Sequence, residues 1–498
     1  MINNVLQYLE IQEQKNPDKY AILEKDGNGF TFKELATKAR EIGSFLAETG
    51  IFKKAIPVFS NQSINSVLLF FGVLYSGNYY VPIDVDTPKD RIEIILNNCK
   101  ATISVGCEKE FDKVEIPYHS IDALLGKENK ELLESVRKKH TINNPLYMVY
   151  TSGSTGTPKG VIKSHNSMIS FIESFVDTFN IEEEIIGNQT PFYFDASGKD
   201  IYLMLKTGST MHIVPKELFM FPVGLINFLN ERKISYICWV PSALAIISQL
   251  NALKTMTLPY IKNVFFVGEV MQIKHLNYWR SHLPEVRYVN LYGSSEMAGT
   301  CSYYIVDREF GLEEKLPIGK PLNGTEMFLL SEDNKLITDD NVGEICVRSP
   351  LLASGYFGDK EKTSKVFVNN VLNDDYLDLM LRTGDLGKYD ENGNIVYVAR
   401  KDYQIKHMGH RIELYEIETY VNALDFIDVS CCLYDEKRSK IVLFFTVTKE
   451  LEDYNKEITV RLKQKLPDYM IPNRFIKIET IQKNKNGKID RVLLKSLI

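Results

Sequence analysis

Apolar and polar positions follow an alternating pattern over most of this chain. Through roughly the first four hundred residues, short apolar runs typical of strands alternate with amphipathic stretches typical of helices. This alternation predicts an α/β fold in which mixed or parallel sheets carry helices on their faces. The longest apolar run, at 67–75, is too short to span a bilayer and is closed by Ser76 and Gly77, so we expect a buried helix there.

Local signals refine the start of this pattern. The segments AILEK and FTF flank the turn DGNG at 26–29 and predict a β-hairpin. Thr31 and Glu34 have the spacing of a capping box, which predicts a helix that runs toward Glu48.

The pattern changes twice further along the chain. From about 301 to 398, short strands separated by glycines predict a β-rich subdomain that ends in a hairpin at Asn392 and Gly393. A smaller α+β pattern follows, so we divide the chain into an N-terminal core, residues 1–401, and a C-terminal domain, residues 402–498. In the C-terminal domain we expect a helix from Glu413, strands near Val429 and Ile441, a helix closing at Leu466 and a last strand near Phe475.

Composition narrows the class of protein. Of the 498 residues, 44% are hydrophobic and 25% charged, a balance typical of a globular protein with more than one domain. A net charge of −6 argues against nucleic acid as the main partner, and the amino terminus lacks the apolar core of a secretion signal, so we also expect no membrane insertion. The seven cysteines include no CxxC pair, which predicts reduced thiols in a cytoplasmic protein without structural zinc, with Cys431 and Cys432 in the core.

The run YTSGSTGTPK at 150–159 carries the clearest chemical signal. Its glycines allow a close backbone approach, its hydroxyls donate hydrogen bonds and Lys159 supplies a positive charge, a combination that suits a polyphosphate. Pro158 stands where the common nucleoside-triphosphatase loop requires glycine. The alternative is a flexible linker, but strand-like segments on both sides favour a phosphate-binding loop.

The chain resembles the adenylate-forming enzymes, which include amino-acid-activating domains of nonribosomal peptide synthesis, D-alanine:carrier-protein ligases and acyl-CoA synthetases. The resemblance spans nearly the whole chain, because further motifs of that superfamily occur in the expected order. They are GNYYVPIDVDTPKDRI from Gly77, FDAS from Phe194, VGEV from Val267, NLYGSSE from Asn290, GEICVRSPLLASGY from Gly343, LRTGDLG from Leu381, ARKDYQIKHMGHRIELYEIE from Ala399 and NGKIDR from Asn486.

This resemblance implies an ATP site with Mg²⁺. Glu296 would bind the metal ion, for which a carboxylate is a suitable ligand. The phosphate cradle would be formed by Thr151, Ser152, Gly153, Ser154, Thr155, Gly156 and Lys159, with Thr151 also counted as catalytic. The other residues implied to bind ATP are Gly268, Glu269, Asn290, Leu291, Tyr292, Gly293, Ser294, Ser295, Asp385, Tyr397 and Arg400. Taken alone, Glu296 is also compatible with a surface charge.

The resemblance also implies a moving C-terminal lid. Lys488 matches the catalytic lysine that bridges the substrate carboxylate and the α-phosphate, although an exposed Asn-Gly-Lys turn by itself is usually only solvated. Asp402 matches the hinge, and Ala399 replaces the glycine that is usual in that motif. After adenylation the lid would rotate and admit a thiol. Because the chain ends at Ile498, the expected acceptor is the phosphopantetheine of a separate carrier protein.

The acid substrate is less strongly indicated. Asp195 matches the residue that pairs with the α-ammonium in amino-acid activators, and its alternative role is to cap the helix that follows. Lys199 lies four positions later and requires an anion if it is buried: a substrate side-chain carboxylate, Asp195 itself, or else solvent reached by snorkelling. The other implied pocket positions are Ala196, Cys238, Phe265, Val267, Leu291, Gly299 and Thr300, with Lys488 at the carboxylate.

Three alternatives to a general amino-acid activator remain open. A D-alanine:carrier-protein ligase agrees in architecture, yet Val267, Leu291 and Lys199 differ from the residues typical of that pocket. An acyl-CoA synthetase is disfavoured by Asp195. A catalytically inactive nucleotide-binding partner protein would bind ATP without forming an adenylate, and retention of Lys488 argues against it.

Overall fold

Two large β-sheets form the body of the molecule. The computed structural model describes residues 2–152, 158–401, 404–482 and 489–498. One sheet has seven strands in the order β19-β8-β7-β4-β3-β5-β6. Its strands are β3 (Ala55–Ser60), β4 (Tyr79–Asp84), β5 (Ser104–Gly106), β6 (Tyr118–Ser120), β7 (Pro145–Thr151), β8 (Lys159–Ser164) and β19 (Gly355–Tyr356).

The second large sheet has nine strands in the order β15-β14-β13-β12-β11-β9-β10-β1-β2. Neighbours from β1 to β13 pair in parallel, whereas β2, β14 and β15 are antiparallel additions at the edges. The strands are β1 (Tyr20–Leu23), β2 (Gly29–Thr31), β9 (Ile185–Asn188), β10 (Thr210–Ile213), β11 (Tyr236–Trp239), β12 (Asn263–Phe266), β13 (Arg287–Tyr292), β14 (Ser302–Ile305) and β15 (Lys320–Pro321).

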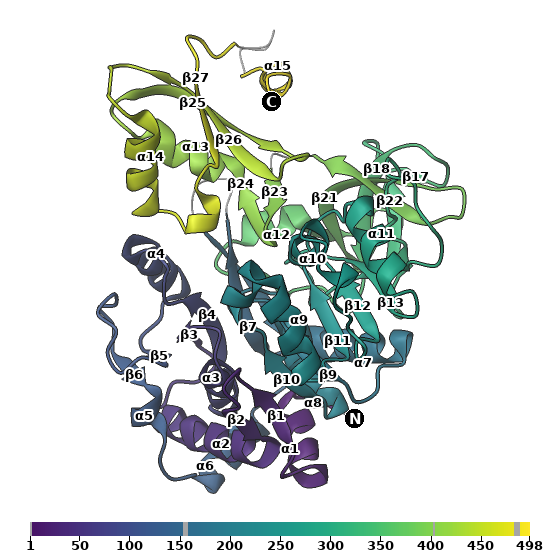
Figure 1. The fold of residues 1–498 in the computed structure, drawn as a ribbon. Helices are drawn as coiled ribbons and strands as arrows, with labels where there is room; N and C mark the ends of the chain where they lie inside the picture. The colour runs from purple at the N-terminus through teal and green to yellow at the C-terminus, as the bar shows by residue number, and fades with distance from the viewer. Residues whose placement is uncertain (1, 153–157, 402–403, 483–488) are drawn as a thin grey trace.

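Helices cover and separate the two sheets (Figure 1). Tyr80 on β4 of the seven-stranded sheet contacts Tyr202 on α8, the helix that connects β9 and β10 of the nine-stranded sheet. Their hydroxyl oxygens are 3.0 Å apart in the buried interior. The helices of this part are α1 (Leu6–Lys15), α2 (Phe32–Glu48), α3 (Ile64–Tyr75), α4 (Lys89–Cys99), α5 (Ile121–Leu124), α6 (Lys130–Lys138), α7 (His165–Phe179), α8 (Ser197–Thr207), α9 (Pro222–Glu231), α10 (Pro241–Gln249) and α11 (Ile273–His282).

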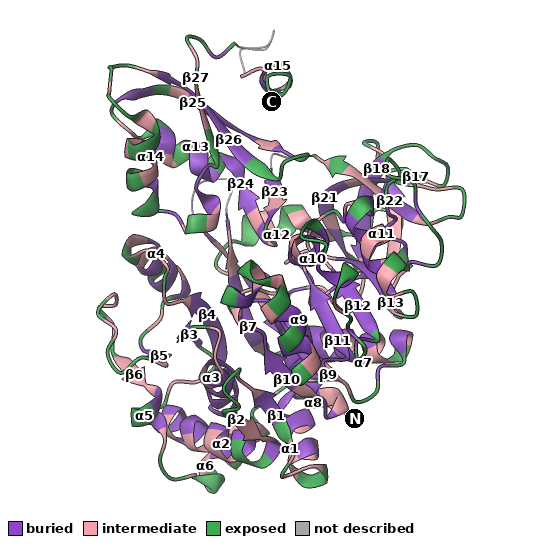
Figure 2. Cartoon of the chain, in the orientation of Figure 1, coloured by how far each residue is buried: buried purple, intermediate pink, exposed green. Residues whose placement is uncertain are grey.

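The packing of α3 shows how the sequence specifies the core. Its apolar run is buried on all sides, and Gly72 faces Ile42 of α2 so closely that an added Cβ would lie 2.3 Å from Ile42 Cγ2. Glycine at this position therefore sets the close approach of the two helices. Figure 2 shows that buried residues occupy the sheets and the helix faces turned toward them, and the predicted buried helix at 67–75 is confirmed.

The predictions made from local signals at the amino terminus are also confirmed. β1 and β2 form the antiparallel hairpin, and the helix after it ends at Glu48. The Thr31 side chain accepts from the Glu34 N–H, while the Glu34 carboxylate accepts from the Thr31 N–H, which completes the capping box.

A smaller six-stranded sheet follows, and it begins later than the sequence predicts. The strands at 302–305 and 320–321 extend the nine-stranded sheet, because β14 pairs with the edge of β13, so the β-rich unit begins at Glu326. The predicted hairpin at Asn392 and Gly393 connects its two last strands. The elements are β16 (Glu326–Leu330), β17 (Leu336–Ile337), β18 (Gly343–Arg348), α12 (Lys360–Val366), β20 (Phe367–Asn369), β21 (Leu379–Tyr389) and β22 (Ile395–Arg400).

The C-terminal elements have a core of their own. The apolar cluster that spans 405–475 contains no described residue from the N-terminal part, which supports the proposed boundary near 402. The second helix ends at Lys463, before the predicted Leu466, and Cys431 and Cys432 are buried as predicted. The elements are β23 (Gln404–His407), β24 (His410–Glu413), α13 (Leu414–Asn422), β25 (Ile427–Asp435), β26 (Lys440–Val447), α14 (Tyr454–Lys463), β27 (Arg474–Lys477) and α15 (Arg491–Lys495).

Among the residues that the structure describes, no helix has both the length and the apolar character that crossing a bilayer requires.

Candidate active site

The predicted phosphate loop lies between two paired strands. β7 and β8 are antiparallel, and their register places Thr151 opposite Lys159, so that the two ends of the loop are adjacent. Residues 153–157, which include Gly153, Ser154, Thr155 and Gly156, lie outside the described residues. The buried Thr151 hydroxyl has no hydrogen-bond partner within the described part of the chain. An unpaired buried hydroxyl is costly, so this group suits a ligand oxygen.

Glu296 is buried and surrounded by cations. Its carboxylate accepts from the Tyr356 hydroxyl at 2.6 Å and forms an ion pair with Arg411. Burial opposes ionisation, but Arg411 and Lys159 hold the pKa of Glu296 well below its usual range. Glu296 therefore stays ionised, as a metal ligand must be. The alternative of a surface charge does not agree with its 3% exposure.

Lys159 is a buried cation with a lowered affinity for its proton. Burial, with a contribution from Arg411, lowers the pKa of Lys159 to about 8, and Glu296 only partly opposes this shift. Its nearest described carboxylate oxygen, on Glu413, is 3.9 Å from Nζ. A phosphate group beside Lys159 would favour the charged form.

This shift leads to a pH-dependent prediction. Because free Lys159 is charged below about pH 8 and neutral above it, the affinity for ATP should fall above pH 8, by up to about tenfold per pH unit. Titration of the protein with ATP between pH 7 and pH 9.5 measures this change. The variant Lys159→Arg keeps its charge over that range, so its affinity should be nearly independent of pH. An equally steep fall in the variant would assign the titration to another group.

Three of the predicted adenosine-binding residues meet where the nine-stranded and six-stranded sheets approach each other. The Tyr292 hydroxyl donates to Asp385 Oδ2, and Arg400 Nη1 lies 2.7 Å from Asp385 Oδ1, so three residues from β13, β21 and β22 share one buried cluster. Asn290 is engaged within the protein, because its amide donates to the Pro317 carbonyl at 2.7 Å. Tyr397 lies on the same strand as Arg400.

The hairpin β23–β24 of the C-terminal part packs onto this site. Ser152 Oγ donates to the Arg411 carbonyl at 2.8 Å and accepts from the Glu413 N–H at 2.9 Å. Gly409 N donates to Glu269 Oε1 at 3.0 Å. The N-terminal core and the C-terminal domain are thus joined through Ser152 and Glu269, two of the predicted nucleotide-binding residues.

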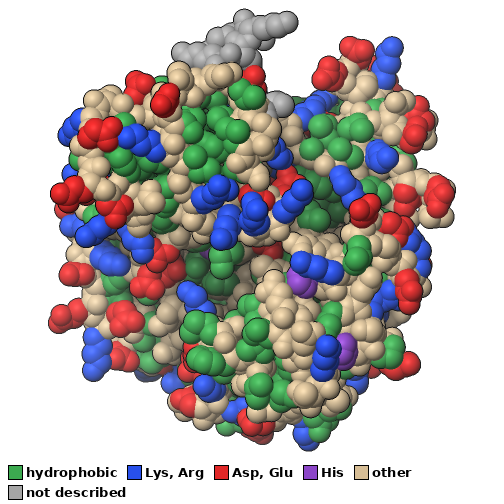
Figure 3. Space-filling view, turned by 45° about the horizontal axis from the view of Figure 1, so that its top comes forward, with side chains coloured by type: hydrophobic (Ala, Val, Ile, Leu, Met, Phe, Trp, Pro, Cys, Tyr) green, Lys and Arg blue, Asp and Glu red, His purple; other side chains and the backbone are tan. Residues whose placement is uncertain are grey.

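The same hairpin reaches the segment that precedes Glu296. Lys406 Nζ donates to the Gly293 carbonyl at 3.2 Å, while Ser294 has a buried hydroxyl without a partner among the described residues. Figure 3 shows Lys and Arg side chains gathered around a hollow on the face turned toward the viewer. The predicted lysine Lys488 and the predicted hinge residue Asp402 lie outside the described residues.

Asp195 is confined by two partners from the seven-stranded sheet. Its Oδ1 accepts from the Tyr147 hydroxyl at 2.8 Å, and its Oδ2 lies 3.1 Å from Lys163 Nζ. The following helix, α8, has Ala196 as its N-cap and no side-chain cap, so Asp195 does not have the capping role that was its alternative. The ion pair with Lys163 was not anticipated from the sequence.

Lys199 has an internal partner that the sequence analysis did not consider. It is buried and forms an ion pair with its neighbour Asp200, whose second oxygen accepts from Asn188 Nδ2 at 3.0 Å. Its ammonium also lies 5.6 Å from the centre of the Tyr236 ring. The anion that burial demands is therefore present in the chain, and Lys199 neither pairs with Asp195 nor points to solvent.

The remaining pocket positions surround this region from the nine-stranded sheet. Gly299 has φ +63°, and a Cβ there would lie 2.3 Å from Phe171 Cζ, so glycine makes room for this ring. The Thr300 hydroxyl is buried without a partner among the described residues. Gly268 has a positive φ as well, and the other side chains lie on or next to central strands: Cys238, Phe265, Val267 and Leu291.

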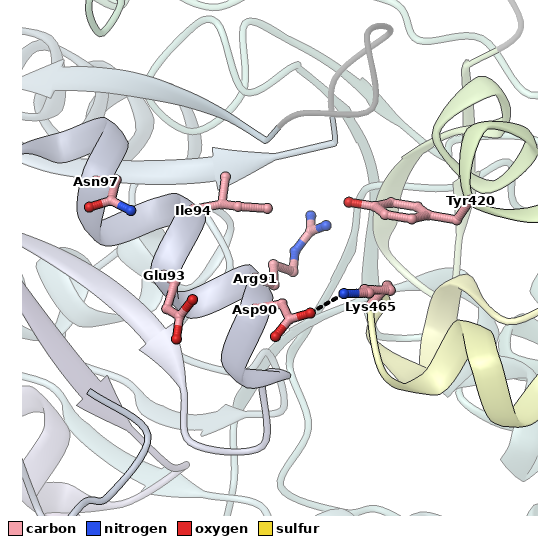
Figure 4. Close-up of a pocket in the computed structure, with 7 residues that line it drawn as sticks. All are labelled: Asp90, Arg91, Glu93, Ile94, Asn97, Tyr420 and Lys465. Carbon is pink, nitrogen blue, oxygen red and sulfur yellow. Dashed lines mark hydrogen bonds and ion pairs between the residues drawn. The ribbon is translucent and has the colours of Figure 1, made fainter. Parts of the chain in front are cut away.

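A separate cavity lies between the two parts of the chain (Figure 4). Its volume is about 310 Å³, and it lies where α4 faces the C-terminal helices. None of the predicted site residues lines it. The side chains around it are Asp90, Arg91, Glu93, Ile94, Asn97, Tyr420 and Lys465.

The described residues fit ATP with Mg²⁺. Thr151 and Ser294 offer unpaired buried hydroxyls, Lys159 offers a cation and Glu296 an ionised carboxylate. The described residues contain no cluster of three or more His, Cys, Asp or Glu side chains suited to a metal ion. Mg²⁺ usually binds through one or two carboxylates together with phosphate oxygens, and Glu296 can supply one such carboxylate.

Several residues of this site were not predicted from the sequence. Lys163 and Tyr147 contact Asp195, and Tyr356 and Arg411 contact Glu296. Tyr356 and Arg411 had a sequence signal, since they belong to the motifs from Gly343 and Ala399 that carried the resemblance.

The site and the fold together define a nucleotide-binding α/β enzyme, and comparisons with known proteins identify its family. Residues 9–357 match the family described as AMP-binding enzyme. The chain therefore belongs to the AMP-binding enzyme family.

Individual relatives agree with this assignment. The chain is 31% identical to part of bacitracin synthase 1 of Bacillus licheniformis, an alignment that covers 97% of this chain but only 9% of that protein. It is 28% identical to a D-alanine--D-alanyl carrier protein ligase of Bacillus anthracis, with 99% of each chain covered. Its fold is similar to the crystal structure of IdnL1, with a TM-score of 0.83, 25% identity and coverage of 97% of this chain and 99% of that one.

Proposed function

We propose that this protein uses ATP to activate the carboxylate of an amino acid as an aminoacyl-adenylate and then transfers the acyl group to the phosphopantetheine thiol of a separate carrier protein. In the first step a carboxylate oxygen bonds to the α-phosphorus while the bond to pyrophosphate breaks. The observation that carries this proposal is that Thr151 lies opposite Lys159 and that Lys159 and Arg411 lie beside Glu296. Asp195 is held nearby, because its partner Lys163 donates to the carbonyls on either side of Glu296.

Each residue of the proposed site would have a separate role in adenylate formation. Lys159 and Thr151 would bind phosphate oxygens, and Asp385 would accept hydrogen bonds from the ribose hydroxyls. Glu296 would ligate Mg²⁺, which lessens the charge repulsion between the phosphates and the incoming carboxylate. Lys488 would place a positive charge between the carboxylate and the α-phosphate.

Similarity to a D-alanine--D-alanyl carrier protein ligase supports the second step. The hinge at Asp402 would let residues 402–498 rotate between the two half-reactions. In this arrangement the hairpin β23–β24 contacts Ser152 and Glu296, so the C-terminal unit lies directly at the site on which it would act. We propose a cytoplasmic location, in keeping with seven free cysteines.

Exchange of labelled pyrophosphate into ATP tests the proposed function. We expect exchange that depends on an amino acid and on Mg²⁺, in a panel that includes both alanine enantiomers, glutamate and aspartate. Exchange supported only by D-alanine would identify a D-alanine:carrier-protein ligase, and exchange supported only by fatty acids would identify an acyl-CoA synthetase. ATP binding without exchange for any acid would contradict the proposal and indicate an inactive nucleotide-binding protein.

A further inference from the structure

Asp195, the carboxylate proposed to contact the substrate, already has a positive partner inside the protein. Lys163, on β8, is fully buried, and its Nζ lies 3.1 Å from Asp195 Oδ2. The same ammonium donates to the carbonyls of Ser295 and Met297. A lysine ammonium has three donors, so all of them are used and Lys163 is fixed in place.

Within this ion pair only the Asp195 side chain is partly exposed. The Asp195 side chain is 15% exposed, whereas that of Lys163 is 0% exposed, so the cation lies behind the anion. The other carboxylate oxygen accepts from the Tyr147 hydroxyl, and burial together with Asp195 raises the pKa of Tyr147 well above its usual value. Tyr147 therefore remains a neutral donor and adds no charge.

This arrangement changes what Asp195 can select. An isolated buried carboxylate attracts an ammonium strongly, because each charge compensates the other. Here Lys163 and Asp195 already form a neutral pair, so a substrate ammonium would leave one positive charge uncompensated in a largely buried site. A hydroxyl would donate to the free lone pairs of Asp195 without adding charge.

We propose that Lys163 is a specificity-determining residue that neutralises Asp195, so that the enzyme activates 2-hydroxy acids at least as readily as the corresponding 2-amino acids. This inference rests on the proposed function and extends its substrate class. The chemistry is the same for both acids: the carboxylate oxygen bonds to the α-phosphorus, and pyrophosphate leaves with the electron pair of the broken bond. Lys163 takes no part in that step.

A purely structural role for Lys163 makes a different prediction. Lys163 also connects β8 to the carbonyls on either side of Glu296, so its loss could disturb that segment. Such a disturbance would lower activity with amino and hydroxy acids in equal proportion. The ratio between the two substrates therefore separates specificity from structure.

The test compares pyrophosphate exchange for matched acid pairs: glutamate with 2-hydroxyglutarate, and each alanine enantiomer with the corresponding lactate. In the unmodified protein, kcat/KM for the hydroxy acid should equal or exceed that for the amino acid. In Lys163→Met the ratio should shift toward the amino acid by about tenfold or more, since close buried charges couple strongly. The exposed control variant Lys365→Met should leave the ratio unchanged.

A second variant decides the matter if Lys163→Met does not fold. Asp195→Asn removes the anion and leaves the charge of Lys163, so activity with the amino acid should fall about tenfold further than activity with the hydroxy acid. Thermal unfolding and ATP binding would verify that this variant is folded.

The outcomes separate this inference from the proposed function. Strict dependence on the ammonium in the unmodified protein, or equal losses for both acids in the variants, would overturn the role of Lys163 while leaving adenylation intact. Absence of exchange with every acid would instead overturn the proposed function, and the inference with it.

Discussion

Replacing Lys488 with methionine is expected to lower the rate of adenylate formation by about 100- to 1000-fold, the scale of deleting a preorganised electrostatic group. Charge develops on the α-phosphate as the carboxylate approaches, and the lysine would compensate it there. Methionine keeps the length of the side chain but not the charge. Binding of ATP should change far less, because Lys159 and Thr151 contact other phosphates in the proposed site.

The segment around Lys488 offers a matched control. Lys485→Met removes the same charge three positions earlier and should leave the rate of pyrophosphate exchange nearly unchanged. The described residues at the two ends of the segment are fixed, since Asp490 N donates to the Gln482 carbonyl at 2.9 Å and Arg491 forms an ion pair with Glu418 at 2.7 Å. Neither variant should therefore alter the fold.

Lys488→Met should affect the two half-reactions, adenylation and thiol transfer, differently. If Lys488 acts only in adenylation, Lys488→Met should still transfer an acyl group from a synthetic adenylate to a carrier thiol at close to the unmodified rate. Equal losses in Lys488→Met and Lys485→Met, or no loss in either, would contradict the role assigned to Lys488.

The parts of the fold that the sequence predicts are those determined by neighbouring residues. The capping box of Thr31 and Glu34 and the turn at 26–29 depend on contacts within a few positions, so their patterns are readable directly. The start of the β-rich unit was misplaced because a short strand at 302–305 can join either of two sheets. Only its pairing with β13 decides which one.

The ion pairs of the site could not be predicted in this way. Arg411 and Glu296 are 115 positions apart, and Lys163 and Asp195 are 32 apart, so no local pattern connects them. Lys163 occupied a strand-like segment, where its charge gave no reason to expect complete burial. Motif resemblance located Glu296 and Asp195, whereas the pairing of Glu296 with Arg411 and of Asp195 with Lys163 required the fold.

Lys199 shows a different limit of sequence reasoning. Adjacent residues on a helix do not normally face each other, so spacing alone argued against a pair with Asp200. The long lysine side chain nevertheless reaches its neighbour in the buried interior. Burial opposes its charge, but the Asp200 carboxylate raises the pKa of Lys199, so the ammonium keeps its charge.

Breaking this pair should cost stability rather than substrate recognition. Lys199→Met leaves the Asp200 carboxylate buried without its cation, and we expect the free energy of unfolding to fall by about 3 to 5 kcal/mol. Denaturant unfolding measures this change. The control Lys206→Met removes a partly exposed lysine from the same helix and should change the free energy of unfolding by less than about 1 kcal/mol.

The double variant Lys199→Met/Asp200→Asn separates the two roles of Lys199. It contains no unpaired charge, and the new amide oxygen can still accept from Asn188, so most of the lost stability should return. If Lys199 instead recognised an acidic substrate, Lys199→Met would unfold at the unmodified denaturant concentration and lose exchange with glutamate and aspartate alone. Because one result is read in stability and the other in substrate preference, a single pair of variants assigns the charge of Lys199 either to the core or to the pocket.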